Sequence, residues 1–187
     1  MRISNIQNMD VKNLQARLKA LVKVGVSLSS IGTLDGLLSE IVDVALSLTD
    51  ADGASLYLRK GDRLEFHISR NLTLEARLGK TAMQDLFERF EIPVDENSMA
   101  GWCAKTGMIL NIPDVQSLPP DGVFHYNPAF DERNQYSSRS MLAAPLLDRQ
   151  NEAVGVIQLW NATAESGIIP FDDNAQDLIS SFASQAG

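Results

Sequence analysis

One segment of the sequence combines aromatic and small polar residues in a way that suits ligand binding. It runs from Pro113 to Ser138, and its Pro-Pro, Asp-Gly and Asn-Pro pairs predict a long loop. Its aromatic residues are Phe124, Tyr126, Phe130 and Tyr136. They can stack on a ligand or simply pack the loop onto the domain, and both interpretations stay open. Arg139 can meet an anionic ligand or form a salt bridge at the strand edge.

Residues that often perform catalysis or bind metals are isolated here from suitable partners. His67 lies in a segment of alternating polarity and His125 in the long loop, and neither has a second ligand at metal-binding spacing. Cys103 lacks a basic neighbour, so we interpret it as a small buried hydrophobe, with redox sensing as the alternative. No phosphate-binding glycine loop or nucleophile elbow is present. We therefore predict no catalytic residue, no metal site and a domain that is not an enzyme.

The composition is that of one globular domain. Of the 187 residues, 44% are hydrophobic and 21% are charged. Lys and Arg number 16 against 24 Asp and Glu, and the net charge of −8 repels phosphate backbones and anionic lipids. We therefore expect no nucleic acid and no membrane insertion. The single Cys fits a reducing compartment, and we recognise no signal peptide, so a cytoplasmic location is expected.

The pattern of apolar positions predicts the elements that hold the loop. We expect an amphipathic helix capped by Thr33, and a last helix that begins at Asp172 or Asp173. The expected extended segments are 54–58, 64–68, 92–94, 109–112, 140–147 and 153–159, and a short helix over 99–103 ends by Gly107. This order predicts an antiparallel α+β sheet covered by helices. Its strands should bury Leu56, Leu58, Leu142, Ala144, Val156 and Leu159.

Residues 1–32 carry a heptad-like row of leucines. Leu14, Leu18 and Leu21 recur at intervals of three and four, which is typical of an amphipathic helix. This stripe can pack on the chain's own core or pair with its copy in a second subunit. We assign residues 1–32 to an N-terminal signalling or dimerisation helix and expect a homodimer through the terminal helices. The apolar pattern near residue 187 is unfinished, which suggests a longer parent protein with an effector domain.

Five segments occur in the order and at the spacing of the GAF domain family, which residues 34–187 resemble. They are DADGASLYL, SMAGWCAKTGMILNIPDV, FDERNQYSSRSMLAAPL, EAVGVIQLWNA and PFDDNAQDLISSFASQA. The likeness is strongest to GAF domains that precede output domains in bacterial signalling proteins, and more distant to those of cyclic-nucleotide phosphodiesterases and adenylate cyclases. The resemblance implies residues 33–187 as one α+β domain. Its six-stranded antiparallel sheet would carry helices on both faces, with the N- and C-terminal helices packed together and the pocket on the opposite face.

The resemblance also implies a set of ligand-binding residues, by position against members that bind cyclic nucleotides. They are Ser55, Met99, Ala100, Tyr126, Asp131, Asn134, Ser138 and Gln158. Hydroxyls and backbone amides would receive the cyclic phosphate, and an aromatic ring would stack on the purine. This sequence departs from the family pattern at three places. Asn134-Gln135 replaces a Thr-Gly pair, Gln158 replaces a strand Glu, and Ala162 replaces the Lys of the phosphodiesterase signature.

These observations lead to one functional hypothesis and two alternatives. The first is a regulatory domain that senses a small molecule between the sheet and the segments 99–103 and 124–138, and relays its state through the terminal helices to an effector. The second is a ligand-free dimerisation or scaffold module. The third is a cyclic-nucleotide-binding domain that regulates a cyclase or phosphodiesterase. We predict no permanent cofactor, with a cyclic nucleotide or another small molecule as the candidate ligand.

Overall fold

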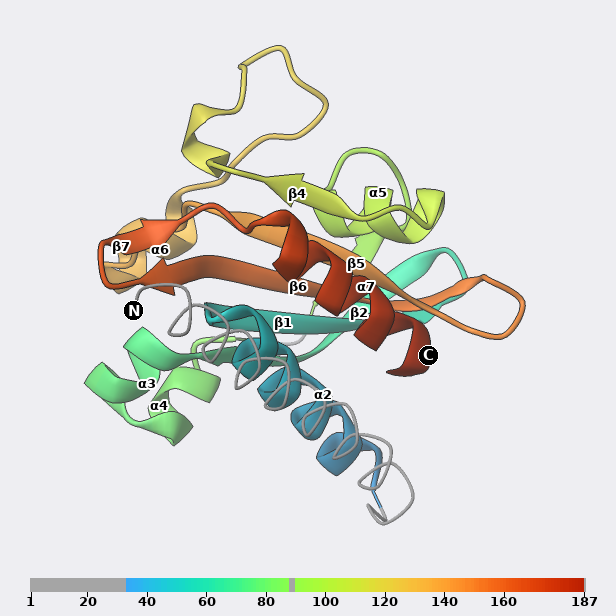
Figure 1. Cartoon of the computed structure of the whole chain (residues 1–187), viewed down its shortest axis with the longest axis horizontal. Helices are drawn as coiled ribbons and strands as arrows, with labels where there is room; N and C mark the ends of the chain where they lie inside the picture. The colour runs from blue at the N-terminus through green and yellow to red at the C-terminus, as the bar shows by residue number, and fades with distance from the viewer. Residues whose placement is uncertain (1–32, 88–89, 187) are drawn as a thin grey trace, which may run out of the picture.

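A single antiparallel sheet forms the centre of the domain (Figure 1). The computed structural model describes residues 33–87 and 90–186, so the leucine row of residues 1–32 lies outside the described residues. Six strands follow the order β3-β2-β1-β6-β5-β4, and β7 pairs with the end of β6. The strands are β1 (Ala51–Lys60), β2 (Arg63–Asn71), β3 (Glu91–Pro93), β4 (Leu110–Ile112), β5 (Met141–Leu147), β6 (Ala153–Ala164) and β7 (Gly167–Ile169). The expected six-stranded antiparallel sheet is confirmed, with β7 as a short addition.

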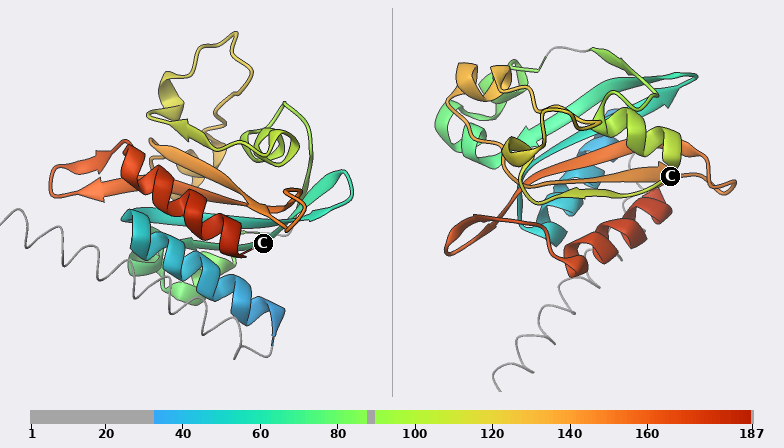
Figure 2. Two further views of the ribbon diagram at one scale, coloured as in Figure 1. Left: turned by 45° about the vertical axis from the view of Figure 1, so that its right-hand side comes forward. Right: turned by 90° about the horizontal axis from the view of Figure 1, so that it is seen from above.

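Helices cover both faces of this sheet, as expected. The right panel of Figure 2 shows α2 and α7 side by side on one face and α5 on the other. The helices are α2 (Leu34–Thr49), α3 (Leu72–Leu78), α4 (Lys80–Gln84), α5 (Met99–Thr106), α6 (Ala129–Asn134) and α7 (Asp173–Ala186), with a 3-10 turn η1 at Val115–Ser117. Among the described helices, none has both the length and the apolar character needed to cross a bilayer.

Local sequence signals explain where the main helices begin and end. The Thr33 side chain accepts a hydrogen bond from the Gly36 amide at the start of α2, as predicted. Asp172 accepts one from the Ala175 amide at 2.7 Å and so caps α7. Gly107 ends α5 with a φ of 67°, a left-handed conformation that glycine adopts without strain.

Alternation along the strands divides the core into two layers. Leu56, Leu142 and Ile157 pack toward α2 and α7, whereas their neighbours Tyr57, Ala143 and Val156 pack toward α5 and the long loop. The predicted burial is confirmed for Leu56, Leu142, Ala144, Val156 and Leu159, whereas Leu58 is only partly buried. The face that carries Tyr57 is the one that holds the candidate site.

Two segments differ from the sequence prediction. Residues 113–138 are not a continuous loop, because they include η1 and α6. The sequence of residues 72–90 is ambiguous, with a helical stripe only near its end, and the structure forms the short helices α3 and α4 over 72–78 and 80–84. Both helices lie near α6 at one end of the sheet (Figures 1 and 2). Contacts with distant parts of the chain hold these short elements, which have too few residues to be stable as isolated helices.

Candidate ligand-binding site

The floor of the candidate site is a row of polar side chains across three strands. The register of the sheet sets Ser55 of β1 opposite Ser69 of β2 on one side and opposite Gln158 of β6 on the other. Residues directly opposite in an antiparallel pair share a face, so these three side chains lie on one surface. The Ser69 hydroxyl donates to the Ala54 carbonyl at 3.1 Å and lies 3.2 Å from the Ser55 hydroxyl. The two serines are therefore hydrogen-bonded to each other and to the strand.

Aromatic rings form one wall of the site. Phe66 of β2 stacks on Phe87 and on Phe90, with centroid distances of 5.7 and 5.0 Å. Phe87 in turn stacks on Phe130 of α6 at 5.0 Å. Tyr57 meets Phe66 edge to face at 5.6 Å. Such pairs favour a fixed arrangement of rings and present flat apolar surfaces to the interior.

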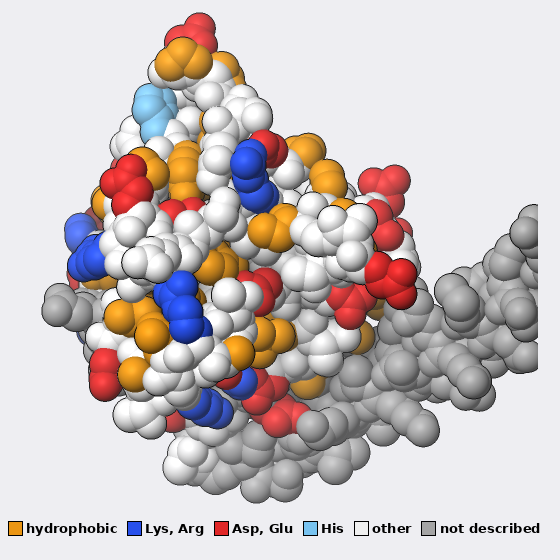
Figure 3. Space-filling view, turned by 90° about the vertical axis from the view of Figure 1, so that its left-hand side faces the viewer, with side chains coloured by type: hydrophobic (Ala, Val, Ile, Leu, Met, Phe, Trp, Pro, Cys, Tyr) orange, Lys and Arg blue, Asp and Glu red, His pale blue; other side chains and the backbone are white. Residues whose placement is uncertain are grey.

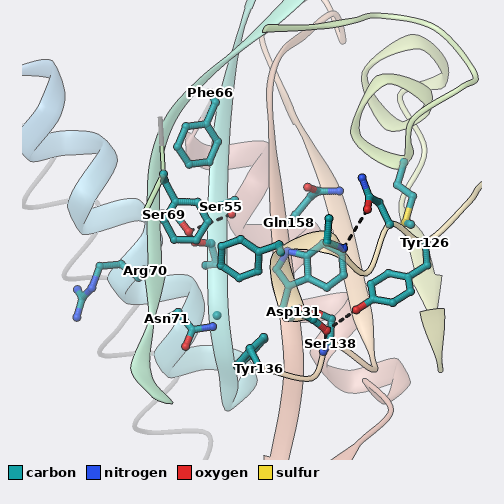
Figure 4. Close-up of a pocket in the computed structure, with 18 of the residues that line it drawn as sticks. Ser55, Phe66, Ser69, Arg70, Asn71, Tyr126, Asp131, Tyr136, Ser138 and Gln158 are labelled. Carbon is teal, nitrogen blue, oxygen red and sulfur yellow. Dashed lines mark hydrogen bonds between the residues drawn. The ribbon is translucent and has the colours of Figure 1, made fainter. Parts of the chain in front are cut away.

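A buried carboxylate fixes the opposite wall. Asp131 of α6 accepts hydrogen bonds from the Tyr126 hydroxyl, the Ser138 amide and the Ser138 hydroxyl, the last at 3.0 Å (Figure 4). The pKa of Tyr126 rises to about 12, first because of burial and then because of its hydrogen bond to the Asp131 carboxylate. The phenol therefore stays protonated at neutral pH and donates to Asp131. The network joins the two ends of the segment that covers the site.

Asn161 anchors the end of this segment to the sheet. Its side chain accepts from the Arg139 amide at 2.7 Å, and donates to the Ser137 carbonyl at 2.8 Å and to the Tyr136 hydroxyl at 2.9 Å. The Tyr136 hydroxyl donates to Asp52 at 2.7 Å. Burial and the Asp52 carboxylate both raise the pKa of Tyr136, so this phenol is also neutral. The chain from residue 136 to 139 is thereby fixed to strands β1 and β6.

Two contacts join α6 to the segment that contains α3 and α4. The Arg77 guanidinium of α3 donates to the carbonyls of Asn134 and Gln135, the latter at 3.1 Å, at the C-terminal end of α6. The stacked pair of Phe87 and Phe130 makes a second connection between the same two segments. These contacts hold the two covering segments together over the sheet.

The space between the sheet and these covering segments, called the pocket below, has a volume of about 540 Å³. This is within the usual range of small-molecule sites. Of the residues assigned by resemblance, the pocket is lined by Ser55, Met99, Tyr126, Asp131, Ser138 and Gln158. Ala100 and Asn134 do not line it. Ala100 of α5 is buried in the core between α5 and the sheet. The Asn134 side chain donates to the Phe130 carbonyl within its own helix at 2.8 Å.

Sequence reasoning missed part of the lining. The additional polar residues are Ser69, Asn71, Asn127 and Tyr136, and the additional aromatic residues are Tyr57, Phe66, Phe87, Phe90, Phe130 and Trp160. Phe130 and Tyr136 were considered for the loop but were not assigned to the site. Ser69 and Asn71 alternate on β2 with residues of the other face, which was a usable signal. Only the strand register, however, places them beside Ser55.

The charged residues at the pocket are engaged or exposed. The Arg70 guanidinium forms ion pairs with Glu75 of α3 and with Asp43 of α2. Arg133 of α6 is exposed at the pocket edge. Arg139 forms the predicted strand-edge salt bridge, with Asp114 at 3.0 Å. On the face in Figure 3, acidic and basic side chains are intermixed, with hydrophobic ones between them.

The remaining candidate chemistry stays separate from the pocket. Cys103 is buried on α5, and burial raises the pKa of its thiol to about 12, so it remains protonated at neutral pH. This agrees with its interpretation as a small hydrophobe. Within residues 33–87 and 90–186, no cluster of three or more His, Cys, Asp or Glu residues could hold a metal ion.

An antiparallel sheet with helices α2 and α7 on one face and a covered pocket on the other defines the class of fold. The profile of the GAF domain family matches residues 33–187, and the chain belongs to this family. GAF domains are regulatory modules of signalling proteins, of a type that senses small molecules.

Known relatives and structures place the chain within a broad family. It is 25% identical over 154 residues to a cGMP-specific 3',5'-cyclic phosphodiesterase of Drosophila sechellia, an alignment that covers 79% of this chain and 12% of that protein. The chain thus corresponds to a small part of these relatives. The A. aeolicus nlh2 GAF domain has the same fold, with a TM-score of 0.65, 16% identity and coverage of 92% of this chain and 93% of that one.

An enzyme also shares the fold. The free methionine-R-sulfoxide reductase from Neisseria meningitidis, solved with its substrate, has a TM-score of 0.62 and 15% identity, with coverage of 91% of this chain and 85% of that one. The likeness concerns the fold alone. It shows that this architecture can hold a small molecule in either a regulatory or a catalytic protein.

Proposed function

We propose that this GAF domain is a small-molecule sensor that regulates an effector domain of its parent protein. The observation that carries the proposal is the pocket of about 540 Å³ between the polar floor of the sheet and the covering segments. A scaffold module has no need of such a space, and in a ligand-free domain the segment would pack directly on the sheet.

The contacts of Arg70 suggest how the state of the pocket reaches the terminal helices. Arg70 lines the pocket from β2, and its guanidinium joins Glu75 of α3 to Asp43 of α2. A ligand that favours one position of α3 therefore also favours one position of α2. By linkage, the ligand shifts the population of arrangements that the effector experiences.

The test is a thermal unfolding experiment on the full chain with a small-molecule extract of the producing cells. A molecule that binds only the folded state at a hundredfold excess over its Kd adds about 2.7 kcal/mol, which raises Tm by about 5–10 °C. We expect this rise in the native chain. Ala129 is exposed at the pocket edge, so Ala129→Trp should block entry without disturbing the core, and Ala129→Ser should leave entry open.

Native mass spectrometry would then identify the molecule retained by the native chain. Equal rises in Tm for the native chain and Ala129→Trp would place binding outside the pocket. No rise in any variant would contradict the sensor proposal and support the scaffold module.

A cyclic nucleotide is the second candidate, favoured by the cGMP-specific phosphodiesterases among the relatives. Ser55, Asp131 and Ser138 line the pocket in agreement with such a ligand. The position of the family's Lys is filled by Ala162, which is buried in the core on the α2 and α7 face. Calorimetric titration with cyclic AMP and cyclic GMP tests this candidate. We expect Asp131→Ala to reduce a measured affinity about ten- to hundredfold, and no binding at millimolar concentration would contradict it.

A further inference from the structure

The carboxamide of Gln158 belongs to a buried residue and has no hydrogen-bond partner among residues 33–87 and 90–186. The residue is 5% exposed and lines the pocket. In the described part of the chain, its side chain makes no hydrogen bond, and the Ser55 hydroxyl opposite it is occupied by Ser69. Figure 4 shows the carboxamide between the β1–β2 side of the pocket and Tyr126. An amide that faces the pocket and has no partner among the described residues is available to hydrogen-bond a bound molecule.

The geometry of a carboxamide restricts what that molecule offers. Its oxygen accepts and its nitrogen donates, and the two atoms lie side by side in one plane. The complementary partner has an adjacent donor and acceptor on one flat edge. Asn and Gln use this arrangement when they recognise the edge of adenine. A lactam or aminopyrimidine edge would satisfy both ends of Gln158 at once.

The walls of the pocket favour a planar molecule. Phe66, Phe87 and Phe130 form a stacked column on one side. Trp160, which is opposite Gly53 in the sheet, and Tyr126 contribute further rings. Rings in these positions gain most from contact with another flat ring, because offset stacking buries apolar area on both faces.

The charges of the pocket disfavour an ionic group in its interior. The Arg70 guanidinium is neutralised by Glu75 and Asp43, and the Asp131 carboxylate is saturated by Tyr126 and Ser138. Arg133 is exposed at the edge. An anion placed against the floor would lose its hydration without gaining a counterion.

We propose that the pocket takes an uncharged planar heterocycle whose adjacent hydrogen-bond donor and acceptor are recognised by Gln158. This inference rests on the proposed function, because it names the class of molecule that the sensor detects. Gln158 then determines specificity for the ligand's polar edge. The aromatic column supplies affinity for flat rings whatever polar groups they carry.

Calorimetric titration of the full chain with four probes tests the proposal. Hypoxanthine and guanosine are uncharged and carry a lactam edge, cyclic GMP carries the same edge with a phosphate, and indole is flat with a donor and no acceptor. We expect hypoxanthine or guanosine to bind at least about tenfold more tightly than indole, which a bidentate pair readily provides. We expect the affinities for guanosine and cyclic GMP, which differ by the phosphate, to lie within about threefold of each other.

Two variants separate the role of Gln158 from general effects on the fold. Gln158→Met keeps the length of the side chain and removes both hydrogen-bonding groups. This variant should lower the affinity for the lactam probes at least about tenfold and leave the affinity for indole within about twofold of its value in the native chain. Gln150→Met changes an exposed Gln in the turn between β5 and β6, and should alter neither.

Three results would overturn the inference. They are indole binding as tightly as the lactam probes, an unchanged lactam affinity in Gln158→Met, and cyclic GMP binding more than about tenfold more tightly than guanosine. Failure of both lactam probes to bind at millimolar concentration would also overturn it. In that case a rise in Tm with the cell extract, absent in Ala129→Trp, would leave the sensor function standing. Loss of that rise as well would remove both proposals.

Discussion

Asp131 shows how one side chain can hold the cover of a pocket. The residue is 6% exposed, and its carboxylate accepts hydrogen bonds from Tyr126 and from two donors of Ser138. These partners saturate the oxygens that the resemblance assigns to a ligand. The contact with a ligand stays a prediction, whereas the closing of the segment follows directly from the geometry.

The variant Asp131→Asn should lower the free energy of unfolding by about 2 kcal/mol, because its amide presents donors where three donors already converge. It should also lower the pKa of Tyr126 from about 12 toward the ordinary value of 10.0, since the carboxylate charge is lost. Urea unfolding and near-ultraviolet titration measure the two effects. Tyr126→Phe is the control, and an unchanged tyrosine titration would contradict the assigned network.

Asn161 combines a left-handed backbone with three side-chain hydrogen bonds. Its φ is 57°, and the residue is 1% exposed. Asn161→Ala should lower the free energy of unfolding by about 2–4 kcal/mol, because it removes the hydrogen bonds and strains the backbone. Asn161→Gly removes the same bonds without the strain and should be about 1 kcal/mol less destabilising. Equal losses in chemical denaturation would show that the backbone conformation contributes nothing.

At the scale of elements, the ion pairs of Arg70 join α2, β2 and α3 around the pocket. The Arg70 and Glu75 side chains are 15% and 13% exposed, and Arg70 Nη2 lies 2.7 Å from Glu75 Oε2. The hydrogen bond from Arg70 holds the pKa of Glu75 below its ordinary value of 4.5. The pocket lining and α2 thus share one electrostatic connection.

Stability from this pair should depend on pH in a defined direction. Because the folded-state pKa of Glu75 is lowered, its contribution is complete above the ordinary value of 4.5 and declines as pH falls through the folded-state pKa. Glu75→Gln should therefore cost about 1–2 kcal/mol at neutral pH and progressively less in acid. Denaturation at several pH values measures the difference. Asp43 is more exposed than Glu75, so Asp43→Asn should lower the free energy of unfolding by less than Glu75→Gln does. A loss in Glu75→Gln that grows in acid would refute the assignment.

At the scale of the whole molecule, the two faces of the sheet are covered by different elements. One face carries α2 and α7, the first and last of the described helices (Figure 2), and the other face carries the pocket. Connections such as Arg70 at the edge of β2 pass between them. A homodimer through the terminal helices would therefore leave the pocket accessible.

The leucine row of residues 1–32 leads to a prediction about assembly. We expect the full chain to be a dimer and residues 33–187 alone to be a monomer, because a leucine row of the predicted kind, Leu14, Leu18 and Leu21, would need an apolar cover. Light scattering over a range of concentrations measures both. Leu18→Glu in the full chain serves as a second test with residues 1–32 retained. An unchanged dimer after deletion would assign assembly to another surface.

Sequence patterns were sufficient for the elements whose signals are local. Thr33 and Asp172 cap helices because a side-chain oxygen satisfies an amide a few residues away. Strand alternation predicted Leu56 and Leu142 as buried, since the period of two follows from the backbone. The family resemblance likewise implied the sheet, and six of the residues that it assigned to a ligand line the pocket.

The contacts between segments far apart in the chain were decided by the tertiary structure alone. Strand register set Ser69 beside Ser55, and the packing of α6 on Phe87 brought two covering segments together. The saturation of Asp131 and the unpaired carboxamide of Gln158 are also invisible in sequence, because each depends on which groups lie within hydrogen-bonding distance. Composition and periodicity record the preference of each residue for burial, whereas the partner that it meets is fixed only when the whole chain folds.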